Sequence, residues 1–409
     1  MPVAVAYPKS TTDVSTIAKI CNEYRIPLIA YSGGSSIEGN FCAPHGGISI
    51  DFAHMNQIVK LNADDMDVVV QPSVPWMTLN EEIAHTGLFF PVDPSPTAQI
   101  GGMVGTNCSG TNAARYGTMK DWIVNLTVVL ADGTVIKTRN RPRKSAAGYN
   151  LNGIFTGSEG TLGLVTEITL KLAVIPKESS VAVVSFPTIR DVAATASAVM
   201  RAGIPVAAME LLDDNAMSVL NRTGSTGIRK WAAKPTLFFK FSGSKASIAD
   251  NVHEVQQISL ANRGGAFEFA SDEAEQHALW SGRKMALWSF LSLRPEGTEL
   301  YSTDVAVPFS RVAEIVGKTI ISHVQHLLSE TKITNTEVSK AEMDKLGLYS
   351  MVVGHLGDGN FHEAIMYNKS NPSEVAMVKG HVQDMINRAL AMEGTCTVRP
   401  AISCVLVYC

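Results

Sequence analysis

The 409-residue sequence contains no apolar run of the roughly 18 residues that a membrane-spanning helix needs. Its start lacks a charged leader before an apolar stretch and lacks an Arg-rich amphipathic helix, so no targeting segment is expected in the chain as it stands. Charged residues make up only 18% and the formal net charge is −4, which gives no electrostatic reason to expect nucleic acid as a partner. The six cysteines have no metal-ligand spacing, which favours a reduced, intracellular protein.

What is present is a regular mixture of strand-like and helix-like segments, which predicts an α+β protein. Hydrophobic residues make up 45%, enough for a sizeable core. We expect residues 1–175 to form a first domain of two α/β subdomains. The pattern changes near Pro176, and residues 176–367 predict an antiparallel sheet with helices on one face. Residues 368–409 predict a last helix and a tail.

The stretch YSGGSSIEG, residues 31–39, follows a predicted buried strand. Its glycines have no Cβ and are followed by two hydroxyl side chains, so consecutive backbone N–H groups can converge on an anion such as a pyrophosphate. The stretch matches neither the Walker loop nor the GxGxxG spacing. An ordinary glycine turn explains these residues equally well.

Residues 91–117 form a long segment, PVDPSPTAQIGGMVGTNCSGTNAARYG, for which no secondary structure is predicted. A loop of this length is usually functional or disordered. Its prolines and paired glycines favour an ordered loop that lays its backbone along a ligand, with a large structural Ω-loop as the alternative. Two such loops in one α/β domain favour a ligand of dinucleotide size.

Near the C-terminus the sequence GHLGDGNFHEAI predicts a β-hairpin. A two-residue turn at Asp358 and Gly359 would place His355 opposite His362, with Cβ atoms about 5 Å apart. Asn360 would share their face because side chains alternate along a strand. Two exposed histidines of no special function would give the same pattern. Two imidazoles alone also do not make a metal site, because a divalent ion needs a third protein ligand, usually a carboxylate.

Taken together with GSEGTLGLVTE at residues 157–167, these stretches resemble the FAD-dependent 2-hydroxy-acid dehydrogenases of the vanillyl-alcohol-oxidase fold. The resemblance is strongest to the mitochondrial, cytochrome-type D-lactate dehydrogenases of fungi, and it covers residues 5–397. It implies a PCMH-type FAD-binding domain followed by a substrate, or cap, domain. It also implies oxidation of D-lactate to pyruvate, with electrons passed to cytochrome c or a similar acceptor. A mitochondrial location follows from the resemblance alone.

The resemblance further implies which residues bind the cofactor. Backbone groups of the glycine turn would contact the FAD pyrophosphate, the long loop would line the flavin and ribityl chain, and the GSEG segment would flank the adenine. No histidine or cysteine lies in the SGGSS turn, which favours non-covalent FAD. The expected cofactor-binding residues are Gly33, Gly34, Ser35, Ser36, Gly39, Pro94, Gly101, Gly102, Thr106, Asn107, Gly110, Glu159, Gly160 and Val165.

In the cap domain, the resemblance assigns catalytic roles to Arg283, His355, Asn360 and His362. Arg283 would meet the substrate carboxylate, and a planar guanidinium suits that role. His355 and His362 would hold a divalent metal, Zn²⁺ or Mn²⁺, that chelates the 2-hydroxy acid and lowers the pKa of its hydroxyl. The alternative for Arg283 is a solvated charge on a helix face.

The sequence departs from the family pattern after Thr397. The family continues there into a Gly-Glu-His-Gly segment whose glutamate is the third metal ligand and whose histidine is the expected base. This chain reads VRPAISCVLVYC and contains no Glu or His after Glu393. We therefore expect a truncated or aberrant C-terminus and a weak metal site. A catalytically impaired flavin-binding remnant is the alternative function.

Overall fold

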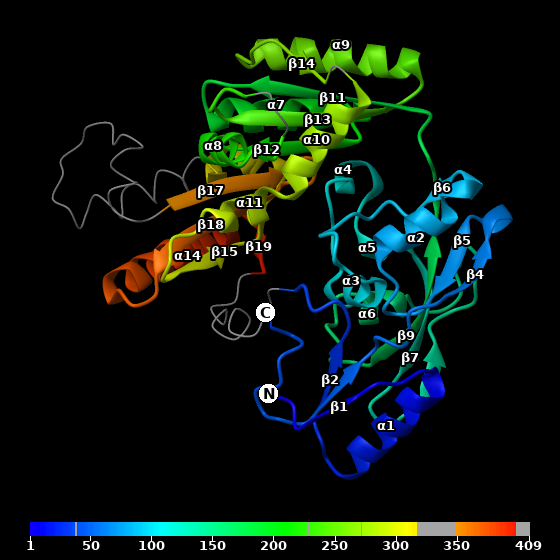
Figure 1. The fold of residues 1–409 in the computed structure, drawn as a ribbon. Helices are drawn as coiled ribbons and strands as arrows, with labels where there is room; N and C mark the ends of the chain where they lie inside the picture. Colours follow the sequence, from blue (N-terminus) through cyan, green and yellow to red (C-terminus); the bar gives the residue numbers. More distant parts are fainter. Residues whose placement is uncertain (37–38, 227–229, 271, 317–348, 398–409) are drawn as a thin grey trace. The chain divides into compact units, whose positions relative to one another are not determined.

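The computed structural model describes residues 1–36, 39–226, 230–270, 272–316 and 349–397. The chain divides into two compact units (Figure 1), of which the first spans Met1–Ile175 and the second begins at Pro176. Each is described below by itself. The helix predicted within residues 368–409 belongs to the second unit.

Unit 1 begins with a small parallel sheet. Its strands β1 (Ala4–Ala6), β3 (Ile48–Asp51) and β2 (Leu28–Tyr31) lie in that order. Helix α1 (Thr11–Glu23) connects β1 to β2 and starts at Ser10, whose hydroxyl accepts a hydrogen bond from the Asp13 N–H at 3.1 Å. Its apolar residues Val14 and Ala18 recur at helical spacing, so they lie on one face and are buried in a cluster with Ile50 of β3.

The second sheet of unit 1 is antiparallel, in the order β4-β5-β9-β7-β8. These strands are β4 (Ile58–Asn62), β5 (Asp67–Val70), β7 (Ile123–Val129), β8 (Val135–Lys137) and β9 (Leu164–Lys171). A two-stranded ladder joins β6 (Leu88–Phe89) to β10 (Ala173–Val174). The helices are α2 (Trp76–Ile83), α3 (Ile100–Thr106), α4 (Ala113–Tyr116), α5 (Met119–Trp122) and α6 (Asn152–Phe155), with 3-10 turns at Ala63–Asp65 and Ala84–Thr86.

Helices α3 and α4 lie within residues 91–117, where the sequence predicted none. Ile100, Met103 and Val104 recur at positions i, i+3 and i+4, and all three are buried in the core of unit 1. The sequence did not predict this helix because it contains paired glycines, and glycine disfavours a helix unless packing compensates.

Unit 2 contains one antiparallel sheet in the order β14-β11-β13-β12-β17-β18-β16-β19, with β15 also pairing with β18. Its strands are β11 (Glu178–Ser185), β12 (Ala208–Leu212), β13 (Thr236–Gly243), β14 (Glu268–Phe269), β15 (Thr298–Ser302), β16 (Val305–Ala306), β17 (Tyr349–His355), β18 (Asn360–Asn368) and β19 (Thr395–Cys396). The helices are α7 (Ile189–Arg201), α8 (Asp214–Thr223), α9 (Lys245–Ala261), α10 (Glu273–Lys284), α11 (Ala286–Ser292) and α14 (Pro372–Ala391).

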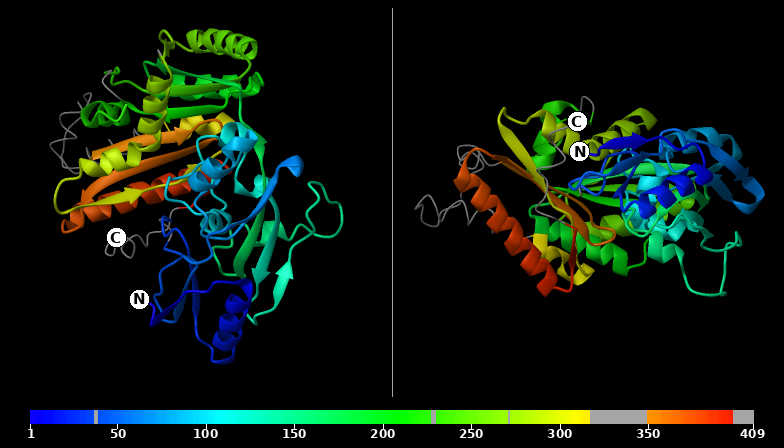
Figure 2. Two further views of the ribbon diagram at one scale, coloured as in Figure 1. Left: turned by 45° about the vertical axis from the view of Figure 1, so that its right-hand side comes forward. Right: turned by 90° about the horizontal axis from the view of Figure 1, so that it is seen from below.

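The α+β class is confirmed, but helices cover both faces of this sheet rather than one. Along β11, Ala182 and Val184 join a cluster with α7, α9 and α14, whereas Val181 and Val183 join a cluster with α8, α10 and α11. Strands that are apolar on both sides need a cover on each face. Both views of Figure 2 show α14, in orange-red, lying along β18.

Candidate active site

In unit 1, the three predicted cofactor segments meet at the end of β2. The Ser32 hydroxyl lies 2.6 Å from Oε1 of Gln99, which precedes α3. A methyl group built at Gly33 would lie 3.2 Å from the Thr97 carbonyl oxygen, and one at Gly160 would lie 3.1 Å from Cβ of Ala30. The glycine turn, the long loop and the GSEG segment are therefore adjacent in space.

The glycine turn itself has a backbone conformation that requires glycine. Gly34 has φ +60°, and a Cβ there would lie 2.4 Å from the Tyr31 hydroxyl, so only glycine fits. Among the described residues, no backbone group accepts a hydrogen bond from the N–H of Gly33, Gly34 or Ser35. Successive N–H groups of this kind suit a pyrophosphate. Ser36 is half-buried beside them, and Gly39 also has positive φ.

A buried aspartate that the sequence analysis missed orders the long loop. Asp93 accepts hydrogen bonds from the Thr111 hydroxyl at 2.6 Å and the Asn112 N–H at 2.9 Å. A methyl at Gly110 would lie 2.4 Å from the Asp93 carboxylate, so the chain needs glycine at this close approach. Pro94 follows directly, at a half-buried position.

The remaining predicted residues of this group lie around α3. A methyl at Gly101 would lie 2.6 Å from Pro72, whereas one at Gly102 would meet nothing within 4 Å. The Thr106 hydroxyl donates to the Gly102 carbonyl at 3.1 Å, and Asn107 ends the helix with φ +47°. The Glu159 N–H donates to the Gly105 carbonyl at 2.9 Å, which ties the GSEG segment to α3. Val165 lies farther along, on β9 opposite Val128.

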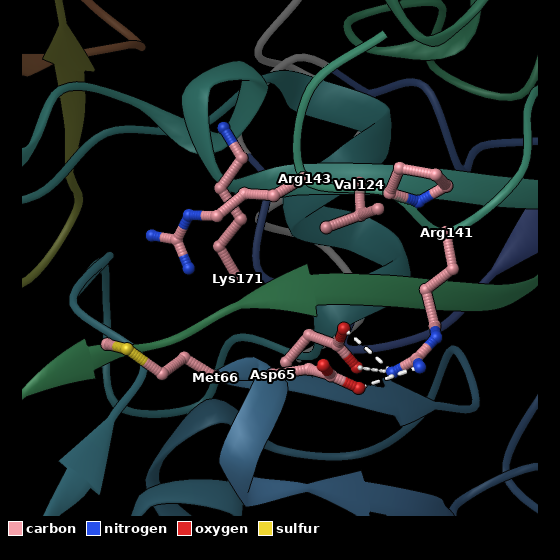
Figure 3. A pocket seen from close by; sticks show the side chains of 8 residues that line it. Asp65, Met66, Val124, Arg141, Arg143 and Lys171 are labelled. Carbon is pink, nitrogen blue, oxygen red and sulfur yellow. Dashed lines mark hydrogen bonds and ion pairs between the residues drawn. The ribbon is translucent and has the colours of Figure 1, made fainter.

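A cavity of about 290 Å³ also opens in unit 1 (Figure 3), and none of the predicted cofactor residues lines it. Its lining includes Arg141, which forms ion pairs with Asp65 at 2.7 Å and Asp67 at 3.0 Å. These pairs hold the segment that follows β8 against the start of β5. The cavity is separate from the predicted cofactor residues.

In unit 2, the hairpin forms with a register two residues away from the predicted one. His355 pairs with Asn360, and His362 pairs with Val353. The turn is a four-residue loop, because Leu356 is buried in the core and the Asp358 N–H returns to the His355 carbonyl at 3.2 Å. A shift of two preserves the faces. His355 and His362 therefore still lie side by side, with ring centroids 5.5 Å apart.

A buried carboxylate joins this face from the neighbouring strand. Glu210 of β12 lies opposite His355 of β17 and is 1% exposed. Its carboxylate is 2.9 Å from Nδ1 of His355 and 2.5 Å from Nη2 of Arg283, which comes from α10. Arg283 is itself 5% exposed, and its Nε has no hydrogen-bond partner among the described residues. Glu210 therefore links Arg283 to His355.

A second polar group surrounds His362. Its Nδ1 lies 3.2 Å from the Thr303 carbonyl and 3.4 Å from Oδ1 of Asp304. Asn360 donates to the same Asp304 oxygen at 2.6 Å, and its own Oδ1 is buried with no hydrogen-bond partner among the described residues. Thr397, just past β19, also donates to Asp304. The chain therefore reaches this site at Thr397, and the tail noted above, residues 398–409, lies outside the described residues.

The surroundings set different charges on the two imidazoles. Burial lowers the pKa of His355, but the Glu210 carboxylate outweighs burial, and the pKa is raised. Burial also lowers the pKa of His362, and Asp304 offsets this only in part, so the pKa stays below the ordinary value. Burial raises the pKa of Asp304, but His362 and two hydrogen bonds together lower it. His355 is thus the more cationic of the two at neutral pH.

The donor set fits a divalent metal only in part. Both imidazoles have Nδ1 directed at an oxygen, which leaves Nε2 of each available, as at carboxylate–histidine–metal sites. Within the described ranges, however, no three His, Cys, Asp or Glu side chains are grouped so that they could hold a metal.

Glu210 and Asp304 each had a signal in the sequence. Glu210 is the one charge in the apolar run VAAMELL, and Asp304 interrupts YSTDVAVP. A charge inside a buried strand needs a partner, so such positions mark polar sites. Their partners lie more than 50 residues away in the chain, and spacing alone did not identify them.

Models of two protein families match the chain. The FAD binding domain matches residues 2–139, and the C-terminal domain of FAD linked oxidases matches residues 175–398. In the part of the chain that the structure describes, no helix has the length and apolar character needed to cross a membrane.

Similar proteins include the mitochondrial D-lactate dehydrogenase [cytochrome] of Kluyveromyces lactis, 46% identical over 97% of this chain and 66% of that protein. D-lactate dehydrogenase [cytochrome] 1 of Saccharomyces cerevisiae is 45% identical over 97% of this chain and 65% of that protein. A probable mitochondrial D-lactate dehydrogenase of Danio rerio is 40% identical over 97% and 76%. The chain thus spans just under two thirds of the length of the yeast relatives.

Solved structures share the fold at low identity. Alkyldihydroxyacetonephosphate synthase aligns with a TM-score of 0.74 at 17% identity, over 96% of this chain and 72% of that one. p-Cresol methylhydroxylase with substrate bound aligns with a TM-score of 0.72 at 17% identity, over 96% and 80%. The family resemblance predicted from the sequence motifs is confirmed, and the chain belongs to the FAD-linked oxidases.

Proposed function

We propose that this chain oxidises a D-2-hydroxy acid, D-lactate, to pyruvate with non-covalently bound FAD. The observation that supports it most directly is the buried Arg283, on the same sheet face as two imidazoles and with an Nε that no described residue contacts by a hydrogen bond. The names of the yeast and fish relatives point to the same reaction and to the mitochondrion. Cytochrome c or a similar one-electron carrier would be the acceptor.

The cofactor would be held by unit 1. The open N–H groups at Gly33, Gly34 and Ser35 suit the pyrophosphate, and the free space at Gly102 suits a group lying over the start of α3. When bound, FAD supplies the acceptor for the hydride from the substrate α-carbon. The protein residues orient the substrate and set the charges around it.

Arg283 would bind the substrate carboxylate. Glu210 already fixes Nη2 of its guanidinium, and Nε, which has no hydrogen-bond partner among the described residues, would donate to the carboxylate. Burial excludes water from this pair, so its electrostatic interactions are stronger than those of a surface arginine. The substrate would then lie with its hydroxyl toward the imidazoles.

His355 and His362 would act on the hydroxyl side. Neutral His362, with Nδ1 held by the Thr303 carbonyl, presents Nε2, which suits a hydrogen bond from the hydroxyl or a bond to a divalent ion. Asn360 adds a buried amide oxygen without a partner. His355 and His362 would be the two described ligands of a Zn²⁺ or Mn²⁺ ion.

The test is to purify the chain with FAD, measure flavin per protein, and follow cytochrome c reduction with D-lactate and with L-lactate. We expect about one FAD per chain and turnover with D-lactate only. A colourless protein that takes up no FAD would reject the whole proposal. A flavin-loaded protein without turnover, in the presence of Zn²⁺ or Mn²⁺, would instead identify the impaired remnant.

A further inference from the structure

We propose that Glu210 is a positioning residue that fixes Arg283 and His355 together for substrate binding, a role that rests on the proposed function. Glu210 has no expected contact with the substrate itself, since it lies 1% exposed beneath both partners. Its carboxylate touches both side chains, at 2.5 Å from Arg283 and 2.9 Å from His355.

The geometry gives the carboxylate two tasks. It occupies Nη2 of Arg283, so the guanidinium plane is fixed while Nε, which lacks a partner among the described residues, remains for a ligand carboxylate. It also accepts from Nδ1 of His355, which fixes the ring orientation and leaves Nε2 on the open side. A single carboxylate thus positions both the side chain proposed to bind the substrate carboxylate and the imidazole proposed to face its hydroxyl.

The surroundings argue against a purely structural role for this pair. The Arg283 and Glu210 side chains are 6% and 1% exposed, whereas His355 is 16% exposed. The network therefore begins in the core and ends at a surface where a ligand can reach it. A buried ion pair is weak evidence for stability, because desolvation cancels much of its attraction.

The same sheet offers a matched control. Glu363 of β18 is also 1% exposed and lies 2.8 Å from a histidine, His381 of α14, but on the opposite face. That histidine is 2% exposed, so α14 seals the pair from ligands. Glu363→Gln removes a buried carboxylate of the same type and depth without touching Arg283 or His355.

The experiment compares Glu210→Gln and Glu363→Gln in the FAD-loaded protein, with oxalate as a probe of carboxylate binding. We expect Glu210→Gln to lower kcat/KM for D-lactate about 100-fold, since misplacing a positioning group costs about that much. We also expect its calorimetric Kd for oxalate to rise about 10-fold, about 1.4 kcal/mol. Glu363→Gln should change both values less than about 3-fold, while its urea midpoint falls.

Two further variants complete the test. Glu210→Asp keeps the charge and should retain an intermediate kcat/KM, which covers the case in which Glu210→Gln does not fold. On an Arg283→Lys background, Glu210→Gln should lower kcat/KM by a smaller factor than on the wild type, because the effects of coupled residues are not additive.

Equal effects of Glu210→Gln and Glu363→Gln, or an unchanged oxalate Kd in Glu210→Gln, would overturn this inference. A wild type that binds oxalate but does not oxidise D-lactate would reject the proposed function alone.

Discussion

The two faces of the unit 2 sheet carry the same chemical pair in opposite settings. On one face Glu210 meets His355, and on the other Glu363 meets His381, at 2.9 and 2.8 Å. Both glutamates are 1% exposed. The histidines differ: His355 is 16% exposed and His381 is 2% exposed. An imidazole that reaches the surface can bind a ligand, whereas a sealed one can only join elements of the fold.

What surrounds each pair sharpens the contrast. The open face adds Arg283, whose Nε has no hydrogen-bond partner in the described part of the chain, and a second imidazole whose centroid is 5.5 Å away. The sealed face adds the apolar stripe of α14, with Val378, Val382 and Met385 in the core, and Arg388, whose Nε and Nη2 likewise have no partner there. The motif of a buried carboxylate and histidine therefore does not identify a site by itself. Access from the surface distinguishes the two pairs, since His355 is 16% exposed and His381 is 2% exposed.

The largest expected effect is on the open face. Arg283→Lys should lower kcat/KM for D-lactate about 1,000-fold, because an ammonium cannot replace a fixed planar fork on a carboxylate. Arg388→Lys, on α14, is the matched control and should change kcat/KM less than about 3-fold. Steady-state kinetics of the two variants check this. Similar losses in both would remove the distinction between the faces.

The next comparison substitutes each of the two histidines by glutamine. His355→Gln should lower kcat/KM about 100-fold and leave the unfolding free energy within about 1 kcal/mol, since it lies at the surface of the site. His381→Gln should do the reverse, with a loss of about 3 kcal/mol from breaking a buried pair. Urea unfolding and D-lactate kinetics on both proteins provide the test. A large stability loss in His355→Gln would show that the open pair is structural too.

A smaller effect concerns acid sensitivity on the sealed face. Burial raises the pKa of Asp191 on α7, but hydrogen bonds from Arg263 and Thr188 lower it overall. A depressed carboxyl pKa contributes stability above the unfolded pKa of about 3.9, and this is lost as pH falls through the folded value. Because Arg263 is 64% exposed, water screens the pair and the contribution is about 1 kcal/mol. Asp191→Asn should be less stable than the wild type at pH 7, and the gap should narrow as the pH falls below the unfolded pKa of about 3.9. A gap that stays constant with pH would contradict this.

The smallest effect on stability is expected in unit 1, which contains neither face of the unit 2 sheet. Arg141→Ala removes two ion pairs at the cavity of Figure 3, and one of its partners, Asp65, is 57% exposed. Exposed pairs contribute little. Its thermal midpoint should fall less than that of Asp191→Asn at pH 7, with no change in FAD content. A loss of FAD from this variant would place the cavity in the cofactor site.

Much of the fold followed from the sequence because alternation and turn residues are local signals. Glycine at 34 was expected in a special turn, and the structure gives it φ +60°. The face shared by His355, Asn360 and His362 was predicted correctly although the register was not. A shift of two residues leaves every side chain on its face.

The features that the sequence did not predict depend on contacts between residues far apart in the chain. The four-residue turn forms because Leu356 is pulled into the core and Gly359 approaches the Val307 carbonyl, where a Cβ would lie 2.4 Å away. Glu210 reaches His355 across 145 residues, through pairing of β12 with β17. Neither contact is encoded in spacing within the hairpin. The cover on both sheet faces likewise depends on helices that lie far apart in the described sequence, from α7 at Ile189–Arg201 to α14 at Pro372–Ala391.

The most direct test of the account is an anaerobic titration of the FAD-loaded chain with D-lactate, followed through the visible absorbance of the flavin. We expect that one equivalent of D-lactate reduces the flavin, that L-lactate does not, and that the flavin of Arg283→Lys is reduced far more slowly. Flavin that stays oxidised with excess D-lactate, or that both enantiomers reduce equally, would contradict it.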